Sequence, residues 1–309
     1  MRPFKTPFKT LLLLIIALAL IPQNACAWGF GVHLQLGCQL LSHISCLPAN
    51  IQQILTNFPA DFLYGCMSAD ITIGKKYTHY LKHCHSWNIG DKILAHASND
   101  AQRACAYGYL SHLAADTIAH SYMVPFKMVR SYNTVFLKHA YWELRFESQI
   151  PEEIWQQARN MAQYDFSQND ELLRDVLENT LFSFGTNKQL FNSMVLISRI
   201  KRWRKLLTFI DKRSRWQVSI LEREQYLDLA LNAIISILSD PVSPYRQADP
   251  AGERALYVAN QLRTNLNQLW LDGKLPKEQS AKLIVELKEK FRHSITQPHE
   301  LLDLLAEQP

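Results

Sequence analysis

The sequence predicts an all-α protein, and three observations carry this prediction. Apolar residues recur at helical spacing along most of the chain, whereas no extended stretch alternates polar and apolar side chains as a strand would. Proline, glycine and capping residues interrupt the helical pattern at positions that suit helix boundaries. The chain has 309 residues, of which 48% are hydrophobic and 20% charged, as in ordinary globular proteins. We therefore expect a multi-helix bundle.

Residues 1–27 have the features of a signal peptide. Basic residues precede an apolar run at 11–20, and Ala25 and Ala27 place small side chains before a cleavage point. The apolar run is too short to cross a bilayer as a helix. Cleavage after Ala27 would expose the α-amine of Trp28, so we expect an exported protein, periplasmic or secreted. The basic residues of this segment supply most of the net charge of +5, which therefore gives no support for a nucleic-acid partner.

Helices are expected in succession through the N-terminal half. The segments with helical spacing are 34–44, 49–58, 59–70, 89–97, 100–123 and 133–148. Between them, 75–87 is polar, aromatic and rich in histidine, so we expect a loop there. Ser98 or Asp100 can cap the helix over 100–123, and Pro125 stands just beyond its expected end.

The C-terminal half is expected to be helical as well. Pro151 suits a first helical turn, Gly273 suits a helix end, and Pro276 opens the last long helix. The one clear loop is 240–244, where two prolines stand close together. Nothing in this half indicates a strand or an internal repeat.

The helix expected over 100–123 carries His112, Asp116 and His120 at steps of four residues. Each step advances a side chain by about 40° around a helix, so the three side chains lie on one face. The rest of this helix is apolar, small or hydroxylic, and ionisable groups on a buried face are costly unless they have partners. Two interpretations fit: a hydrogen-bonded core network and a metal site.

Residues of the ligand type recur elsewhere in the chain. His139 and Glu143 repeat the four-residue step, Asp70 and His85 flank the expected loop, and His33 follows the expected new N-terminus. Histidine and carboxylate are the donors that zinc takes at hydrolytic sites. Together these side chains exceed what one metal can use, so we expect a cluster of ions.

Five cysteines follow the expected cleavage point, and their odd number leaves at least one of them unpaired or intermolecular. Their pairing cannot be read from the sequence. Cys84 stands beside His85, which would suit a metal ligand, but a buried or disulfide-bonded structural cysteine explains it better.

A basic segment with aromatic residues occupies 199–216. Its candidates for contact with a membrane surface are Arg202, Trp203, Arg204 and Trp216. Cations would face lipid phosphates there, and tryptophans would lie at headgroup depth. An ordinary surface helix packed on its apolar stripe explains the same pattern, and we favour that interpretation.

In their order along the chain, the ligand-type residues resemble the zinc-dependent phospholipase C superfamily, which is related to single-strand-specific zinc nucleases and glycosylphosphatidylinositol-specific phospholipase D. The matching residues are Trp28, His33, Asp70, His85, His112-x3-Asp116, His120 and His139-x3-Glu143. The resemblance implies an all-α multi-helix bundle around a trinuclear zinc site. Residues 28–150 would form the zinc-binding core, and 151–309 a helical extension that completes the same domain.

The resemblance also implies a distribution of ligands among three zinc ions. The ligands of the first ion would be Asp70, His85, His112 and Asp116. The ligands of the second would be Trp28, through its α-amine and carbonyl oxygen, His33 and a bridging Asp116. The ligands of the third would be His120, His139 and Glu143. Two departures stand out: the step from Asp116 to His120 is shorter than in the bacterial phospholipases and the nucleases, and His83 is an alternative to His85.

The function implied is that of an exported zinc-dependent phosphodiesterase that hydrolyses phospholipids, with a metal-activated water attacking phosphorus. Asp70 would be a ligand and a catalytic residue that orients or deprotonates the water. The expected partners are a phospholipid or another phosphodiester and, peripherally, a membrane; nucleic acid is less favoured. The alternatives are a nuclease or 3′-nucleotidase, a phospholipase D-type hydrolase, and a non-catalytic, zinc-stabilised helical binding protein.

Overall fold

A computed structural model describes residues 28–71, 84–134, 139–177 and 216–301 of the chain. These residues form helices and connecting turns, and no strand occurs among them. The prediction of an all-α protein is confirmed. Within the same ranges, no helix combines the length and the apolarity that crossing a membrane requires.

The described helices follow the expected order, with some shifted ends. Those before residue 150 are α2 (Phe30–Ser42), η1 (Ile44–Cys46), α3 (Ala49–Asn57), α4 (Pro59–Ser68), η2 (Ala69–Ile71), α5 (Trp87–His96), α6 (Asp100–Ile118), η5 (Ala119–Met123), α7 (Val124–Arg130) and α8 (His139–Glu147). Those after it are α9 (Glu152–Met161), α10 (Ser167–Val176), α13 (Ile220–Ser239), η6 (Pro244–Gln247), α14 (Glu253–Leu271) and α15 (Lys277–His293).

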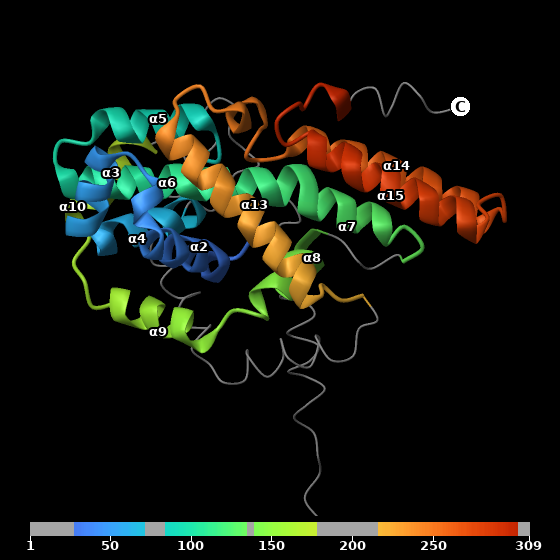
Figure 1. The fold of residues 1–309 in the computed structure, drawn as a ribbon, viewed down its shortest axis with the longest axis horizontal. Helices are drawn as coiled ribbons and strands as arrows, with labels where there is room; N and C mark the ends of the chain where they lie inside the picture. Colours follow the sequence, from blue (N-terminus) through green and yellow to red (C-terminus); the bar gives the residue numbers. More distant parts are fainter. Residues whose placement is uncertain (1–27, 72–83, 135–138, 178–215, 302–309) are drawn as a thin grey trace, which may run out of the picture.

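Helix α6 is the central element of the bundle (Figure 1). Its side chains are buried around most of its circumference, and it packs most extensively against α4 and α13. A helix that is apolar or small on nearly every face is the kind that a core encloses. The cap is Asn99, whose side chain accepts the backbone N–H of Gln102, and not Ser98 or Asp100 as predicted.

The helical path does not end near Met123, as the position of Pro125 predicted. A five-residue π-helical turn, Ala119–Met123, follows α6, and the chain continues directly into α7. Pro125 lies in the first turn of α7, a position that proline tolerates. The proline therefore begins the next helix. Such π-helical turns are frequent at functional sites, and this one carries His120.

Helices α4 and α6 cross closely because each presents a glycine at the contact. A Cβ on Gly108 would overlap the carbonyl oxygen of Phe62, and Gly65 faces the backbone of α6 in the same way. This close crossing brings the carbonyl oxygen of Cys66 within 2.9 Å of Nδ1 of His112. The two glycines thus determine where a predicted ligand lies.

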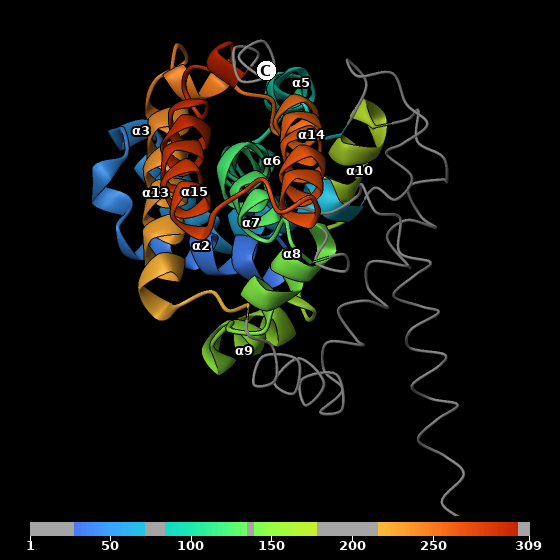
Figure 2. The same cartoon turned by 90° about the vertical axis from the view of Figure 1, so that its right-hand side faces the viewer.

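The C-terminal helices pack on the same core. Helix α13 packs across α6, while α14 and α15 both contact α7 (Figure 2). Helices α14 and α15, joined by the turn 272–276, form a helical hairpin that extends beyond the end of α7 (Figure 1). We call the residues around this turn the hairpin tip.

No disulfide joins two cysteines within the described ranges. Cys66, Cys84 and Cys105 are buried, Cys38 is half-buried and Cys46 is exposed. Burial raises the pKa of the Cys105 and Cys66 thiols above the usual range, so both behave as small apolar side chains. This fits the structural role expected for the buried cysteines.

A substitution of Gly108 tests the close crossing. We expect Gly108→Ala to destabilise the protein by on the order of 3 kcal/mol, because the new methyl group meets backbone that cannot yield. Gly90→Ala is the matched control, since its Cβ would meet only the side-chain tips of Leu110 and Leu113. Thermal unfolding should show a large drop in Tm for the first variant and a small change for the second. Equal Tm values for the two variants would show that the close crossing of α4 and α6 does not require a glycine at position 108.

Candidate metal centre

The structure brings the predicted side-chain ligands together in two places. Three groups have ligand atoms within 4.8 Å of one another: His33, His112 and Asp116; Asp70, His85 and His112; and His120, His139 and Glu143. The first two groups share His112, and we call them the paired site. The remaining group is the third site.

Four separate segments build the paired site. Helix α2 carries His33 and the short helix η2 carries Asp70, while His85 lies two residues before the start of α5. Helix α6 supplies His112 and Asp116, one turn apart. All of these side chains are buried except that of Asp70, which is 11% exposed.

Asp116 lies at the centre of the paired site. Its Oδ1 is 3.2 Å from Nε2 of His33, and its Oδ2 is 3.2 Å from Nε2 of both His85 and His112. Despite these distances, neither carboxylate oxygen has a hydrogen bond, and neither does Nε2 of His33. Buried polar atoms that converge without hydrogen bonding are costly, whereas a metal ion would satisfy all of them. The residues present therefore fit a metal such as zinc.

Neighbouring groups turn the imidazoles toward Asp116. Nδ1 of His112 lies 2.9 Å from the carbonyl oxygen of Cys66, which can only accept, so Nδ1 carries a proton and Nε2 is the nitrogen that faces Asp116. Nδ1 of His85 lies 3.2 Å from Sγ of Cys84. The Tyr109 hydroxyl donates to the carbonyl oxygen of Cys84 at 2.5 Å and so fixes the turn that carries His85.

His33 and Asp116 have the protonation states that a metal ion requires of its ligands. Burial lowers the pKa of His33, and the charge of His112 lowers it further, so the imidazole is neutral. Burial alone would raise the pKa of Asp116, but the charge of His112 holds it well below the usual range, and the carboxylate is ionised. Neutral imidazole and ionised carboxylate are the forms that bind zinc.

His112 behaves differently. Burial lowers its pKa, but Asp116 and Asp70 together raise it above the usual value. Without a metal, His112 therefore tends to hold a proton on Nε2, and a metal must displace that proton. Zinc affinity at the paired site should consequently fall as the pH falls.

The third site combines both halves of the chain. Nε2 of His139 lies 2.8 Å from Oε1 of Glu143, one turn along α8. Nδ1 of His120 lies 2.6 Å from the carbonyl oxygen of Pro250, which leaves Nε2 for the site. Gly252, at φ 63°, lies so close to His120 that a Cβ would overlap the histidine side chain. The turn before α14 therefore positions a ligand on η5.

His112 and His120 belong to different sites although one continuous helical path carries both. Eight helical residues advance about 12 Å along the axis, so side chains at the two ends cannot meet at one ion. The ladder recognised in the sequence is thus a row along one face, with the paired site at one end and the third site at the other.

Glu147 is a functional residue that the sequence reasoning missed. Its Oε1 accepts the backbone N–H of Gly31 at 3.1 Å, and a Cβ on Gly29 or Gly31 would press against its carboxylate. Burial raises the pKa of Glu147 to about 7, although the hydrogen bonds from Gly31 and its neighbour partly offset the effect. The carboxylate fixes the start of α2, which carries His33. The available signal was the four-residue step, which continues from Glu143 to Glu147.

Several predicted residues remain to be placed. Trp28 is the first described residue; it is fully buried and its ring centroid is 5.2 Å from that of Phe146, while its role as a backbone ligand stays a prediction. Trp216, a membrane-surface candidate, is half-buried, packs against the core and accepts a hydrogen bond from Tyr141 at its carbonyl oxygen. The residues that lie outside the described ranges are His83, Arg202, Trp203 and Arg204.

The fold and the two sites define a helical protein built to hold metal ions. Residues 32–182 match the family model of zinc dependent phospholipase C, and this match supports the resemblance to that superfamily. The matched region includes every predicted side-chain ligand from His33 to Glu143. No curated protein and no solved structure matches the chain. The family supports zinc-dependent phosphodiester hydrolysis as the general activity.

Two substitutions of Glu147 test its role. We expect Glu147→Leu to destabilise the protein by about 2 kcal/mol, because it leaves the buried N–H of Gly31 without an acceptor. Glu147→Gln keeps an acceptor oxygen in the same place and should cost much less. Urea unfolding compares the two, and equal losses of stability would show that the hydrogen bond is unimportant.

Metal removal tests the paired site without any assay of activity. A metal that binds only the folded chain at a hundred times its Kd stabilises it by about 2.7 kcal/mol, so a chelator should lower Tm by several degrees. Asp116→Asn should abolish most of this shift, because Asp116 contacts three imidazoles. Asp100→Asn, at the exposed start of the same helix, is the control and should respond like the parent chain. A full chelator response in Asp116→Asn would place the metal elsewhere.

Proposed function

We propose that this protein is an exported zinc-dependent phosphodiesterase that hydrolyses phospholipids in the manner of a phospholipase C. It would release diacylglycerol and a phosphorylated headgroup. The observation that carries this proposal is the family match, because it spans the segment whose ligand-type side chains the structure gathers into two buried sites. Export rests on the expected signal peptide, whose removal would give Trp28 the free amine that a backbone ligand needs.

Asp116 has the arrangement of a bridging ligand. Its Oδ1 faces His33, whereas its Oδ2 faces His85 and His112, so its two oxygens point to two ligand sets. Zinc held by these side chains would activate water at neutral pH and neutralise charge on phosphoryl oxygens. Histidines and carboxylates that are already in place at a buried site reduce the reorganisation needed during the reaction.

Asp70 is the residue of the paired site that solvent reaches. Its Oδ1 lies 3.5 Å from Nε2 of His85 and 4.0 Å from Nε2 of His112, and its side chain is 11% exposed. A substrate phosphate that enters from solvent therefore meets Asp70 first. We assign to its carboxylate the role of orienting the attacking water and accepting its proton.

Metal content and hydrolysis, measured on one sample of the chain beginning at Trp28, test the proposal. We expect close to three zinc ions per chain and release of a water-soluble phosphorylated headgroup from phosphatidylcholine. Release of phosphatidic acid would indicate phospholipase D-type cleavage, and cleavage of single-stranded DNA alone would indicate a nuclease. Zinc binding without hydrolysis of either substrate would support the non-catalytic alternative.

Substitution of the central carboxylate connects activity to the site. We expect Asp116→Asn to reduce hydrolysis by at least about a thousandfold and to lower bound zinc, because the amide cannot bridge two cations. Asp100→Asn should keep both properties. Full activity in Asp116→Asn would refute the metal centre as the catalytic site.

A further inference from the structure

The hairpin tip exposes three consecutive large apolar residues. Leu269 is 40% exposed, Trp270 44% and Leu271 70%. A helix that packs through one apolar stripe exposes residues of this type singly, so three in succession show that α14 continues past the core that it covers. In Figure 1 the tip extends beyond the end of α7.

The base of the tip is tied to the body of the protein. Tyr132, in the turn after α7, accepts the side-chain N–H of Asn267 at its carbonyl oxygen, at 3.1 Å. Its hydroxyl lies 2.8 Å from that of Ser280 on α15. One residue therefore holds both arms of the hairpin, and the apolar residues beyond it project from a fixed base. Because these contacts already hold the base of the hairpin in place, less conformational entropy is lost when the tip binds a partner.

The charges around the tip suit a lipid–water interface. From Thr264 to Leu271 helix α14 has no charged residue. The charged side chains that follow are Asp272, Lys274, Lys277, Glu278 and Lys282, all exposed and in sum positive. An indole and two leucines flanked by lysines match the interfacial zone of a bilayer, where rings lie at headgroup depth and cations meet phosphates.

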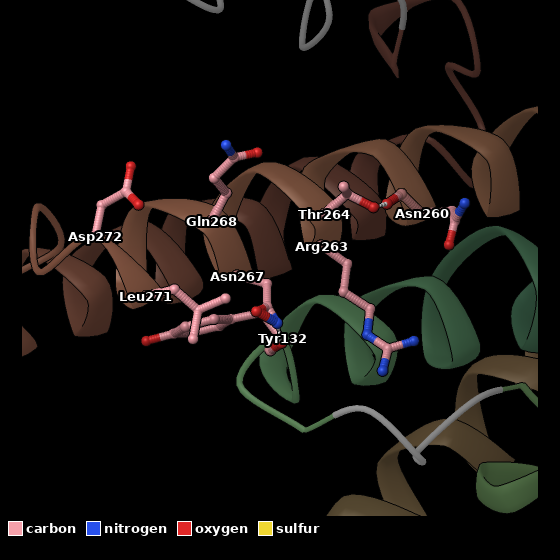
Figure 3. Close-up of a pocket in the computed structure, with 8 residues that line it drawn as sticks. All are labelled: Tyr132, Asn260, Arg263, Thr264, Asn267, Gln268, Leu271 and Asp272. Carbon is pink, nitrogen blue, oxygen red and sulfur yellow. Dashed lines mark hydrogen bonds between the residues drawn. The ribbon is translucent and has the colours of Figure 1, made fainter.

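A groove of about 480 Å³ runs along α14 behind the tip (Figure 3). Leu271 and Asp272 line it at the end nearest the tip, and Asn260 lines the opposite end. Arg263 lies between them and donates a hydrogen bond to the carbonyl oxygen of Thr134. The other side chains along the middle of the groove are polar and uncharged, so the guanidinium of Arg263 is the group there that suits a lipid phosphate.

We propose that three apolar residues of the hairpin tip, Leu269, Trp270 and Leu271, dock this protein on a phospholipid surface. Arg263, in the adjoining groove, would bind a lipid phosphate. This inference rests on the proposed function, because a phospholipid hydrolase must meet its substrate in a membrane. A second copy of the chain is the other conceivable occupant. A stable dimer buries roughly 800 Å² on each partner, and three partly exposed side chains with a polar surround supply far less apolar area.

Vesicle co-sedimentation tests the docking surface. The chain beginning at Trp28 carries Asp116→Asn so that it does not consume the lipid, and the vesicles contain phosphatidylcholine and phosphatidylglycerol. We expect the added pair Trp270→Ser and Leu271→Ser to weaken binding by at least about tenfold. Val242→Ser is the matched control, because Val242 is 85% exposed in the loop after α13 and should not affect binding. Arg263→Gln should weaken binding several-fold, with a Tm check on its folding.

Some results would overturn the docking proposal. These are no binding by the parent chain, equal binding by the Trp270→Ser and Leu271→Ser variant, and a dimer in sedimentation equilibrium that this variant dissociates. Its failure is distinguishable from failure of the proposed function. With Asp116 restored, the tip variant should keep kcat/KM on dispersed short-chain phosphatidylcholine and lose it on vesicles. No hydrolysis of the dispersed lipid by the parent chain would contradict the proposed function and leave the binding result unaffected.

Discussion

The buried carboxylate of Asp116 is the constraint on which the rest of the structure depends. Its oxygens lie 3.2 Å from three imidazoles, and no backbone donor offsets the cost of burying them. A negative charge can remain there only when cations face it. The imidazoles alone meet this need in part, since His33 is held neutral, and metal ions would meet it fully.

The surrounding architecture delivers those imidazoles to Asp116. The glycines of α4 and α6 allow the two helices to approach until a carbonyl of α4 orients His112. Tyr109 holds the turn that carries His85, and Glu147 holds the start of the helix that carries His33. Each of these contacts joins residues far apart in the sequence. The site is therefore a property of the assembled bundle and could not form on any one helix.

The third site depends on the C-terminal half of the chain as well as on the N-terminal half. His120 lies on the π-helical turn, and the carbonyl oxygen of Pro250 orients it from the turn before α14. The same α14 continues to the apolar hairpin tip, and Tyr132 ties that tip to the end of α7. A single helix thus supports a ligand at its start and carries the proposed lipid-binding surface at its end. Under the two proposals, this arrangement would give the region after residue 151 a part in both the chemistry and the encounter with substrate.

The sequence by itself determined the all-α class, the family and the identity and order of the ligand-type residues. Helical periodicity is local, and His139 with Glu143 or His112 with Asp116 face the same way on any regular helix. Pro125 misled because the same residue can follow one helix or begin the next, and only the π-helical turn before it decided which. The cap of α6 was misplaced by one residue for a similar reason, since Ser98, Asn99 and Asp100 all can cap.

Only the tertiary structure decided which ligands share a site, which carbonyl oxygens orient them and that Glu147 supports α2. These outcomes depend on the helix crossing set by Gly65 and Gly108 and on the turn at Gly252, whose close approaches involve partners distant in the chain. Spacing along one helix cannot supply such distances. It gives the direction of each side chain, whereas the meeting of side chains from different helices follows from how closely the helices pack.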